Sequence, residues 1–151
     1  MAEVEINGIA HIQLSVGDMD ASRAFYRRLL VDGFGMAVQY DAPEAFYCIG
    51  ARTGLLIAPR DPAFAEPFHQ RRVGLHHLCF RARSREAIDR LHEMLVEMGA
   101  TIVHSPEDGP WAPGYYSVLF EDPDGIRLEA NFVPGKGNLD RIKGGPLVRP
   151  E

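Results

Sequence analysis

The sequence predicts an α+β fold built from two tandem βαβββ modules. Two observations carry this prediction: one order of strand-like and helix-like segments occurs twice, and each copy begins with a short alternating run that contains histidine. Apolar residues at every second position indicate a strand with one face on a core, whereas an apolar stripe every three to four residues indicates an amphipathic helix. Each copy is too small to bury its own sheet alone, which favours a duplicated unit.

The first module is expected over about residues 6–60. Its first strand is residues 9–16 (IAHIQLSV), and a helix follows with Asp18 or Asp20 as its N-cap. Apolar residues at i, i+4 and i+8 form the predicted buried face of this helix: Ala21, Phe25 and Leu29. Three short strand-like runs complete the module, at about residues 36–40, 45–50 and 55–58.

The second module is expected over about residues 74–134, after a proline-containing connector at 61–73. It begins with a strand at 75–82 (LHHLCFRA), and Ser84 is the predicted N-cap of its helix. One face of this helix is apolar: Ile88, Leu91, Leu95 and Met98. Three strands follow, at about 101–104, 115–120 and 126–133. Residues 135–151 are turn-rich and are expected to form a tail.

Composition narrows the class of protein. The chain has 151 residues, 46% of them hydrophobic and 25% charged, as expected of a single globular domain over residues 1–151. A formal net charge of -5 and scattered arginines argue against a nucleic acid partner. No apolar run approaches the roughly 20 residues that span a bilayer, and no signal peptide is evident, so we expect a cytoplasmic protein with no membrane partner. Cys48 and Cys79 are expected to be reduced, buried thiols.

Strand parity places two histidines and one glutamate on faces that the helices do not cover. Successive side chains of a strand point to opposite faces. When the apolar residues of each strand take the core face, His11, His77 and Glu129 take the opposite face of the first, fifth and last strands. His11 and His77 also occupy equivalent positions in the two modules. If the sheet curls into a trough, these faces line it.

This combination of side chains predicts a catalytic metal site. Two imidazoles and one carboxylate suit a divalent ion such as Fe, Mn, Ni, Co or Zn, and a set of three leaves open positions for substrate. A single strand histidine is more often an ordinary core or surface residue, so the prediction depends on all three together. His76 is the alternative candidate for the second metal ligand. Because it shares parity with the apolar Leu78 and Phe80, we favour His77.

Three segments carry a family resemblance: IAHIQLSV with the FYRRLL helix after it, GLHHLCFRA, and VLFEDPDGIRLEANF. Over about residues 9–134 the chain resembles the vicinal oxygen chelate superfamily of glyoxalases, bleomycin resistance proteins and dioxygenases. The resemblance implies two βαβββ modules that form a curled mixed sheet around a metal cleft. It also implies a homodimer, and a small substrate whose adjacent oxygens chelate the ion.

Departures from the family pattern help to choose a reaction, which the fold does not give. Counting four residues past the hairpin glycine leads to Glu129 in the second module but to Ala58 in the first, so a fourth ligand is missing there. Three ligands fit dioxygenase-like and thiol-transferase-like sites better than a four-ligand lyase, although a partner subunit could supply the fourth. The predicted function is a divalent-metal-dependent glyoxalase-like lyase, isomerase or transferase, and the alternative is an Fe(II) extradiol-type dioxygenase. Ring-cleaving dioxygenases usually carry a His and a Tyr before the Asp-Pro turn, where Phe120 stands here. A non-catalytic drug-binding resistance protein is the third alternative.

Further polar residues are candidates for binding the small-molecule substrate. They lie on the predicted metal-side faces or at the start of the predicted second-to-last strand: Gln13, Tyr115, Tyr116, Arg127 and Asn131. Arg127 shares the face of Glu129 and could pair with a substrate anion or with that carboxylate. The sequence identifies no general base.

Overall fold

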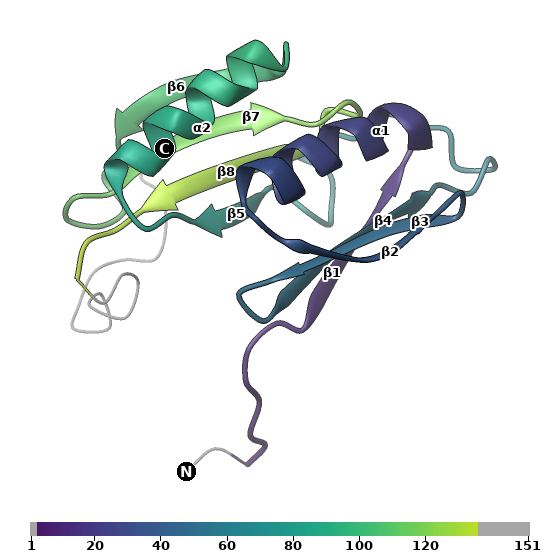
Figure 1. Ribbon diagram of the computed structural model, residues 1–151, viewed down its shortest axis with the longest axis horizontal. Helices are drawn as coiled ribbons and strands as arrows, with labels where there is room; N and C mark the ends of the chain where they lie inside the picture. The colour runs from purple at the N-terminus through teal and green to yellow at the C-terminus, as the bar shows by residue number, and fades with distance from the viewer. Residues whose placement is uncertain (1–2, 136–151) are drawn as a thin grey trace. The chain divides into compact units, whose positions relative to one another are not determined.

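Eight strands form two separate four-stranded mixed sheets, each accompanied by its own helix (Figure 1). The computed structural model describes residues 3–135, so the predicted tail beyond residue 135 lies outside the described residues. The chain divides into two compact units, Met1–Pro67 and Phe68–Glu151, and this boundary falls inside the predicted connector. The prediction of two tandem βαβββ modules is confirmed.

The first unit contains one parallel and two antiparallel strand pairs. In chain order its elements are β1 (His11–Val16), α1 (Met19–Tyr26), a π-helical turn η1 (Arg27–Gly33), β2 (Ala37–Ala42), β3 (Ala45–Gly50) and β4 (Thr53–Pro59). The strand order is β1-β4-β3-β2, with β1 parallel to β4. Leu14 and Val16 of β1 are buried, as the alternation predicts, and so are Phe46 and Ile57 from the neighbouring strands.

Helix α1 begins where the sequence indicates but buries a different face. Asp18 is the N-cap: its Oδ1 accepts hydrogen bonds from the backbone nitrogens of Asp20 and Ala21, each at 3.0 Å. The buried residues of α1 and η1 are Ser22, Tyr26, Leu29 and Leu30. The predicted face was therefore wrong at Ala21, which is exposed, and at Phe25, which is only partly buried. Phe25 and Tyr26 are adjacent aromatic residues, and packing of the larger Tyr26 against the core sets the rotation of the helix.

The second unit repeats the topology of the first. Its elements are β5 (Leu78–Arg81), α2 (Arg85–Glu97), β6 (Thr101–Asp108), β7 (Tyr116–Glu121) and β8 (Arg127–Phe132). The strand order is β5-β8-β7-β6, with β5 parallel to β8. Strand β6 runs four residues past its predicted end and contains Pro106. Proline is tolerated there because β6 is an edge strand with register shifts.

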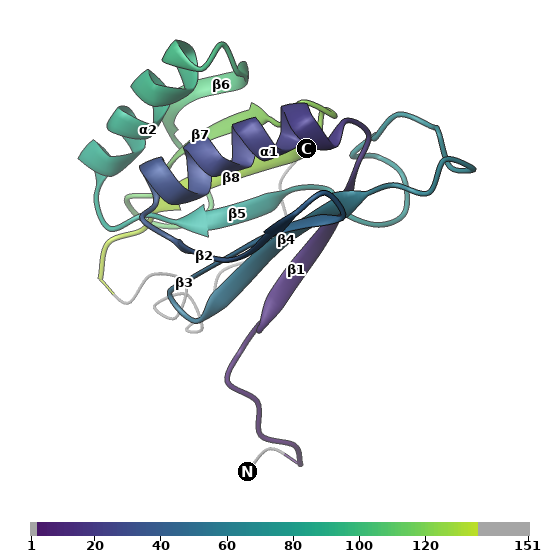
Figure 2. The ribbon, with the colours of Figure 1, turned by 45° about the vertical axis from the view of Figure 1, so that its right-hand side comes forward.

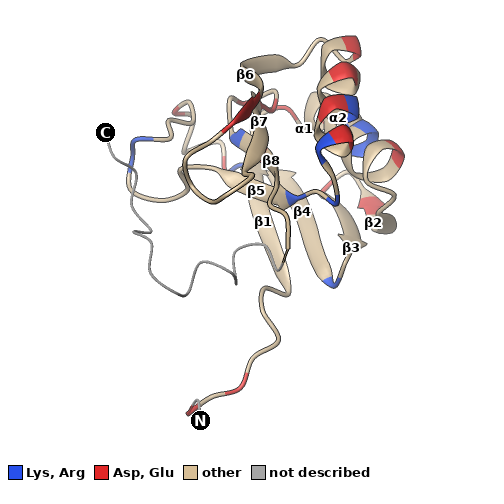
Figure 3. Ribbon diagram, turned by 90° about the vertical axis from the view of Figure 1, so that its left-hand side faces the viewer, with Lys and Arg blue, Asp and Glu red and all other residues tan. Residues whose placement is uncertain are grey.

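Helix α2 begins at its predicted N-cap and buries three of the four predicted residues, whereas Met98 is its C-cap and is half-buried. Ser84 caps it by accepting a hydrogen bond from the Ala87 nitrogen at 3.1 Å, and Ile88, Leu91 and Leu95 are buried. Figure 2 shows α2 lying along β6 and β7. Figure 3 shows acidic and basic residues along this helix. Because α2 covers one face of the sheet, side chains of the other face are available for a site.

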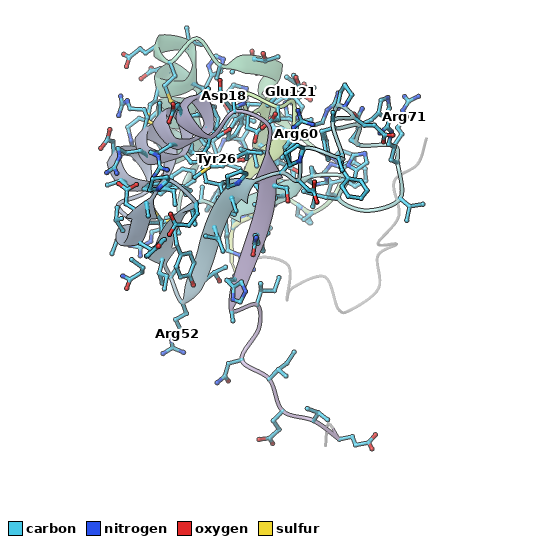
Figure 4. All side chains as sticks on the ribbon, turned by 90° about the vertical axis from the view of Figure 1, so that its right-hand side faces the viewer. Asp18, Tyr26, Arg52, Arg60, Arg71 and Glu121 are labelled. Atoms are coloured by element: carbon cyan, nitrogen blue, oxygen red, sulfur yellow. The ribbon has the colours of Figure 1, made fainter. Side chains whose placement is uncertain are left out.

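The two hairpins that lead into the last strand of each unit differ in length. Ala51 and Arg52 form a two-residue turn between β3 and β4, both with positive φ (48° and 67°). Figure 4 shows Arg52 projecting from the tip of this turn. The turn between β7 and β8 is longer and is closed by Asp122, whose Oδ1 accepts hydrogen bonds from the nitrogens of Asp124 (2.9 Å) and Ile126 (2.8 Å). Counting from the hairpin glycine therefore does not give equivalent positions in the two units.

Both cysteines are free thiols. Cys48 in β3 is buried, as predicted, but Cys79 in β5 is exposed as a residue. The prediction for Cys79 was wrong because β5 is the edge strand of its sheet, with β8 on one side only. None of the helices in the described part of the chain is long and apolar enough to cross a membrane.

Candidate functional site

The second unit brings together two of the three predicted metal ligands. Glu129 lies in β8, between Cys79 of β5 and Leu119 of β7 in the strand register, and its residue surface is 8% exposed. His77 immediately precedes β5. Its Nε2 lies 3.0 Å from Glu129 Oε2. The residue before β5 and a residue of its parallel neighbour β8 therefore bring an imidazole nitrogen and a carboxylate oxygen together.

The spacing of these two donors fits a metal ion. Imidazole nitrogen and carboxylate oxygen bind metal ions such as Zn²⁺ at about 2.0–2.2 Å, so two such atoms on one ion lie about 3 Å apart at a right angle and about 3.4 Å apart at the tetrahedral angle that Zn²⁺ prefers. The observed 3.0 Å also fits a direct hydrogen bond between His77 and Glu129. Across residues 3–135, no three side chains of the His, Cys, Asp or Glu type form a group ready to hold an ion. Among the described residues, the second unit therefore brings together one imidazole nitrogen and one carboxylate oxygen, without a third side chain of this kind beside them.

The geometry separates His77 from its neighbour His76. His77 presents Nε2 to Glu129, while its other ring nitrogen, Nδ1, lies 2.8 Å from His76 Nδ1. The two rings meet edge to face, with centroids 5.0 Å apart. His76 therefore contacts the side of the His77 ring that faces away from the carboxylate. A partner on the second nitrogen of a ligating histidine fixes its tautomer and orientation.

Tyr115 holds the other oxygen of Glu129. It lies just before β7, is 8% exposed, and its hydroxyl donates a hydrogen bond to Glu129 Oε1. Asn131, two residues after Glu129 in β8, is also hydrogen-bonded to Tyr115. Burial and then the hydrogen bond to Glu129 raise the pKa of Tyr115. The hydroxyl is therefore protonated at neutral pH and acts as a donor.

Opposing effects set the pKa of Glu129. Burial acts to raise it, but hydrogen bonds from His77 and Tyr115, the proximity of His77 and a hydrogen bond with Ser117 outweigh burial. The pKa of Glu129 is lowered from its ordinary value as a result. At neutral pH the group is a carboxylate, the form that a metal ion requires.

The remaining predicted substrate residues of this unit are placed differently. Arg127 Nε lies 3.5 Å from Glu121 Oε1, so a carboxylate other than Glu129 neighbours it. Tyr116 donates its hydroxyl to Asp89 of α2 at 2.7 Å, and Arg85 lies over its ring. Tyr116 therefore faces the helix, on the opposite side of the sheet from Glu129. The sequence prediction grouped Tyr116 with Tyr115, although adjacent strand positions point to opposite faces. Tyr116 therefore lies outside the group of side chains around Glu129.

The first unit holds the other two predicted residues. His11 begins β1, is exposed, and meets Tyr47 edge to face at a centroid distance of 6.5 Å. Gln13, also exposed, pairs with Leu56 in the register of β1 and β4. If His11 is equivalent to His77, then Gln13, two residues later, is equivalent to Cys79. Leu56, which pairs with Gln13, then corresponds to Glu129, which pairs with Cys79.

That register corrects one detail of the sequence analysis. Leu56, rather than Ala58, is the first-unit residue at the position of Glu129. The count failed because the β3–β4 turn is shorter than the β7–β8 turn. Leucine binds metal no better than alanine does, so the inference that this strand supplies no fourth ligand is unchanged.

Two residues near Glu129 were not singled out as site residues. Cys79 is its direct partner in the parallel β5–β8 pair, and burial and then the Glu129 charge raise the pKa of its thiol. Ser117 of β7 is 5% exposed and bonds to Glu129. Strand parity alone places Cys79 on the same face as His77. The contact between Ser117 and Glu129 depends on the register between β7 and β8, which the sequence leaves open.

Comparisons with known proteins agree with this architecture. A family model described as the Glyoxalase/Bleomycin resistance protein/Dioxygenase superfamily matches residues 8–130. The uncharacterized protein YqjT of Bacillus subtilis (strain 168) is 31% identical over 127 residues, which cover 79% of this chain and 94% of that protein. Among solved structures, a candidate glyoxalase from Bacillus halodurans is 30% identical with a TM-score of 0.73, covering 84% of this chain and 96% of its own. A lactoylglutathione lyase from Agrobacterium tumefaciens is 27% identical with a TM-score of 0.62, covering 84% and 94%.

Proposed function

This chain belongs to the glyoxalase/bleomycin resistance protein/dioxygenase superfamily, and on that premise we propose that it is a divalent-metal-dependent, glyoxalase-like enzyme. The reaction is a lyase, isomerase or transferase reaction on a small substrate that presents adjacent oxygens. One observation carries the proposal: a buried carboxylate, Glu129 Oε2, lies 3.0 Å from His77 Nε2 on the sheet face opposite α2. An imidazole nitrogen and a carboxylate oxygen are the ligands that a divalent metal ion of this kind accepts.

The residues that would hold the ion are His77, Glu129 and, from the first unit, His11. The sequence supports His11 through its equivalence to His77, and the ion is Fe, Mn, Ni, Co or Zn. When bound, such an ion acts as a Lewis acid that stabilises negative charge on substrate oxygens. His77 binds through Nε2 when its proton resides on Nδ1, the nitrogen in contact with His76. Three protein ligands leave coordination positions open for substrate.

The proposal assigns the substrate-facing roles to the chain's own polar groups. Asn131 is 9% exposed on the Glu129 face, and its amide can donate to or accept from a substrate oxygen. Gln13 supplies an exposed amide from β1. The guanidinium of Arg127, two residues before Glu129, can pair with an anionic substrate group in competition with Glu121.

Metal titration of the metal-free protein tests the proposal. An ion present at 100 times its dissociation constant stabilises the folded state by about 2.7 kcal/mol, a rise in melting temperature of roughly 5–10 °C for a domain of this size. We expect this rise for the wild type with at least one of Fe(II), Mn²⁺, Ni²⁺, Co²⁺ and Zn²⁺. His77→Ala and Glu129→Gln should abolish it.

His69→Ala is the matched control, because His69 is an exposed histidine of the connector. It should leave the rise unchanged. If none of the five ions raises the melting temperature, or if His77→Ala binds as tightly as the wild type, the proposed metal site is wrong.

The reaction is tested on the metal-loaded protein. Glutathione hemithioacetals are the first substrates to try, because a lactoylglutathione lyase is 27% identical to this chain. Thiol donors with small electrophiles test a transferase. Oxygen uptake with catechols would instead indicate the dioxygenase alternative, and tight binding of a small molecule without turnover would indicate the drug-binding alternative.

The proposal includes a cytoplasmic homodimer. Light scattering after size-exclusion chromatography measures the assembly directly, and a mass near that of one chain would overturn the dimer.

A further inference from the structure

We propose that Tyr115 is a positioning residue for Glu129: its hydroxyl holds Oε1 so that Oε2 alone is presented beside His77 Nε2. The inference rests on the proposed metal site. It gives Tyr115 a different role from the substrate contact that the sequence suggests.

The two oxygens of Glu129 have different partners. Oε1 accepts the hydroxyl of Tyr115, and Oε2 lies 3.0 Å from His77 Nε2. These contacts come from opposite neighbours in the sheet, since His77 precedes β5 and Tyr115 precedes β7, with β8 between them. A carboxylate held from both sides has a defined rotation about its terminal bond. In this rotation Oε2, rather than Oε1, faces His77 Nε2.

The Tyr115 side chain is itself fixed. Its backbone nitrogen donates to Ala112 O at 3.0 Å, and its carbonyl accepts from the Gly109 nitrogen at 2.9 Å. The ring packs on Gly109 so closely that a Cβ at that position would lie 2.9 Å from Tyr115 Cδ1. Asn131 bonds to the hydroxyl as well. Backbone, ring and hydroxyl are therefore all held before any ligand is present.

A fixed donor on the non-ligating oxygen affects how well Glu129 binds an ion. It removes the need to order the carboxylate on binding, and it disfavours coordination through both oxygens. Hydrogen bonds to ligating groups typically contribute a factor of 10–100 to metal affinity. Loss of the hydroxyl should therefore weaken metal binding even though Tyr115 does not bind the metal.

The test compares Tyr115→Phe with Tyr116→Phe. Both variants remove one hydroxyl that donates to one carboxylate, from adjacent residues, but the Tyr116 hydroxyl bonds to Asp89 on the helix side. Dissociation constants for Zn²⁺ and Co²⁺ are measured on metal-free protein by competition with a chromophoric chelator. We expect a 10–100-fold weaker constant for Tyr115→Phe and a change of less than twofold for Tyr116→Phe.

The absorption spectrum of bound Co²⁺ distinguishes a change in the metal ligands from a general loss of protein stability. Its visible bands depend on the number and arrangement of ligands, so they should change in Tyr115→Phe and not in Tyr116→Phe. If Tyr115→Phe does not fold, Tyr115→Leu carries the same test, since it also removes the hydroxyl; weaker Co²⁺ binding supports the inference and unchanged binding overturns it.

The outcomes separate this inference from the proposed function. If wild type and Tyr115→Phe bind Co²⁺ equally well with identical spectra, Tyr115 does not position Glu129, while the metal site stands. If the wild type binds neither ion, the metal site fails and the inference fails with it.

Discussion

Removing the Tyr115 hydroxyl and the Glu129 carboxylate, singly and together, measures the strength of their contact in the metal-free protein. Both residues are 8% exposed, and the acceptor is a carboxylate whose pKa is lowered in the folded state. A hydrogen bond to a charged group contributes about 1.5–3 kcal/mol. We therefore expect the cycle of Tyr115→Phe, Glu129→Ala and the double variant to give a coupling energy in that range at pH 7.

The assay is urea denaturation followed by circular dichroism, with free energies of unfolding compared at equal m-values. Tyr116 and Asp89 provide the control cycle, since they are also a tyrosine and a carboxylate in hydrogen-bond contact, but Asp89 is exposed. Water competes for an exposed contact, so their coupling energy should be smaller. Equal coupling energies in the two cycles would refute the argument that burial strengthens the Tyr115–Glu129 contact.

The same cycle has a predicted pH dependence. The folded state lowers the pKa of Glu129 from its ordinary value of 4.5, so its ionised form stabilises the fold fully above that value. This contribution is lost as the pH falls through the lowered folded-state pKa, because the native carboxylate then becomes protonated. The coupling energy should therefore be constant from pH 6 to 7 and decrease below pH 4. A coupling that grows on acidification would contradict this assignment.

Three further outcomes follow from the structure. Asp18→Ala should lower the free energy of unfolding in urea by about 1 kcal/mol, because Asp18 caps α1, whereas Asp20→Ala should have a smaller effect. Leu95→Ala should cost about 2–5 kcal/mol in the same assay, because Leu95 is fully buried, while Val96→Ala, at a position 58% exposed, should change it by less than about 0.5 kcal/mol. Iodoacetamide should modify Cys79 at pH 7.5 more slowly in folded than in urea-unfolded protein: although the residue is exposed, desolvation by the surrounding protein and then the Glu129 charge raise the pKa of its thiol. Equal rates by mass spectrometry would contradict that environment.

The sequence by itself determined the repeated topology, because period-two and period-3.6 patterns depend only on the local chain. It determined the caps and buried face of α2, where Ser84 precedes a regular apolar stripe. It also indicated His77 and Glu129 through strand parity, and the second unit brings these two side chains together, although β5 begins only at Leu78 and His77 lies before it. His11 as the third ligand stays a prediction.

Tertiary structure decided the contacts that periodicity does not encode. Adjacent aromatic residues left the rotation of α1 open until Tyr26, rather than Phe25, packed into the core. Parity places Tyr115 and Tyr116 on opposite faces of the sheet, but the packing of β7 against β8 and α2 decides that one hydroxyl reaches Glu129 and the other reaches Asp89. The physical reason is that parity assigns a side chain to a face, whereas its partner on that face is set by register and turn length, which depend on the packing of distant segments.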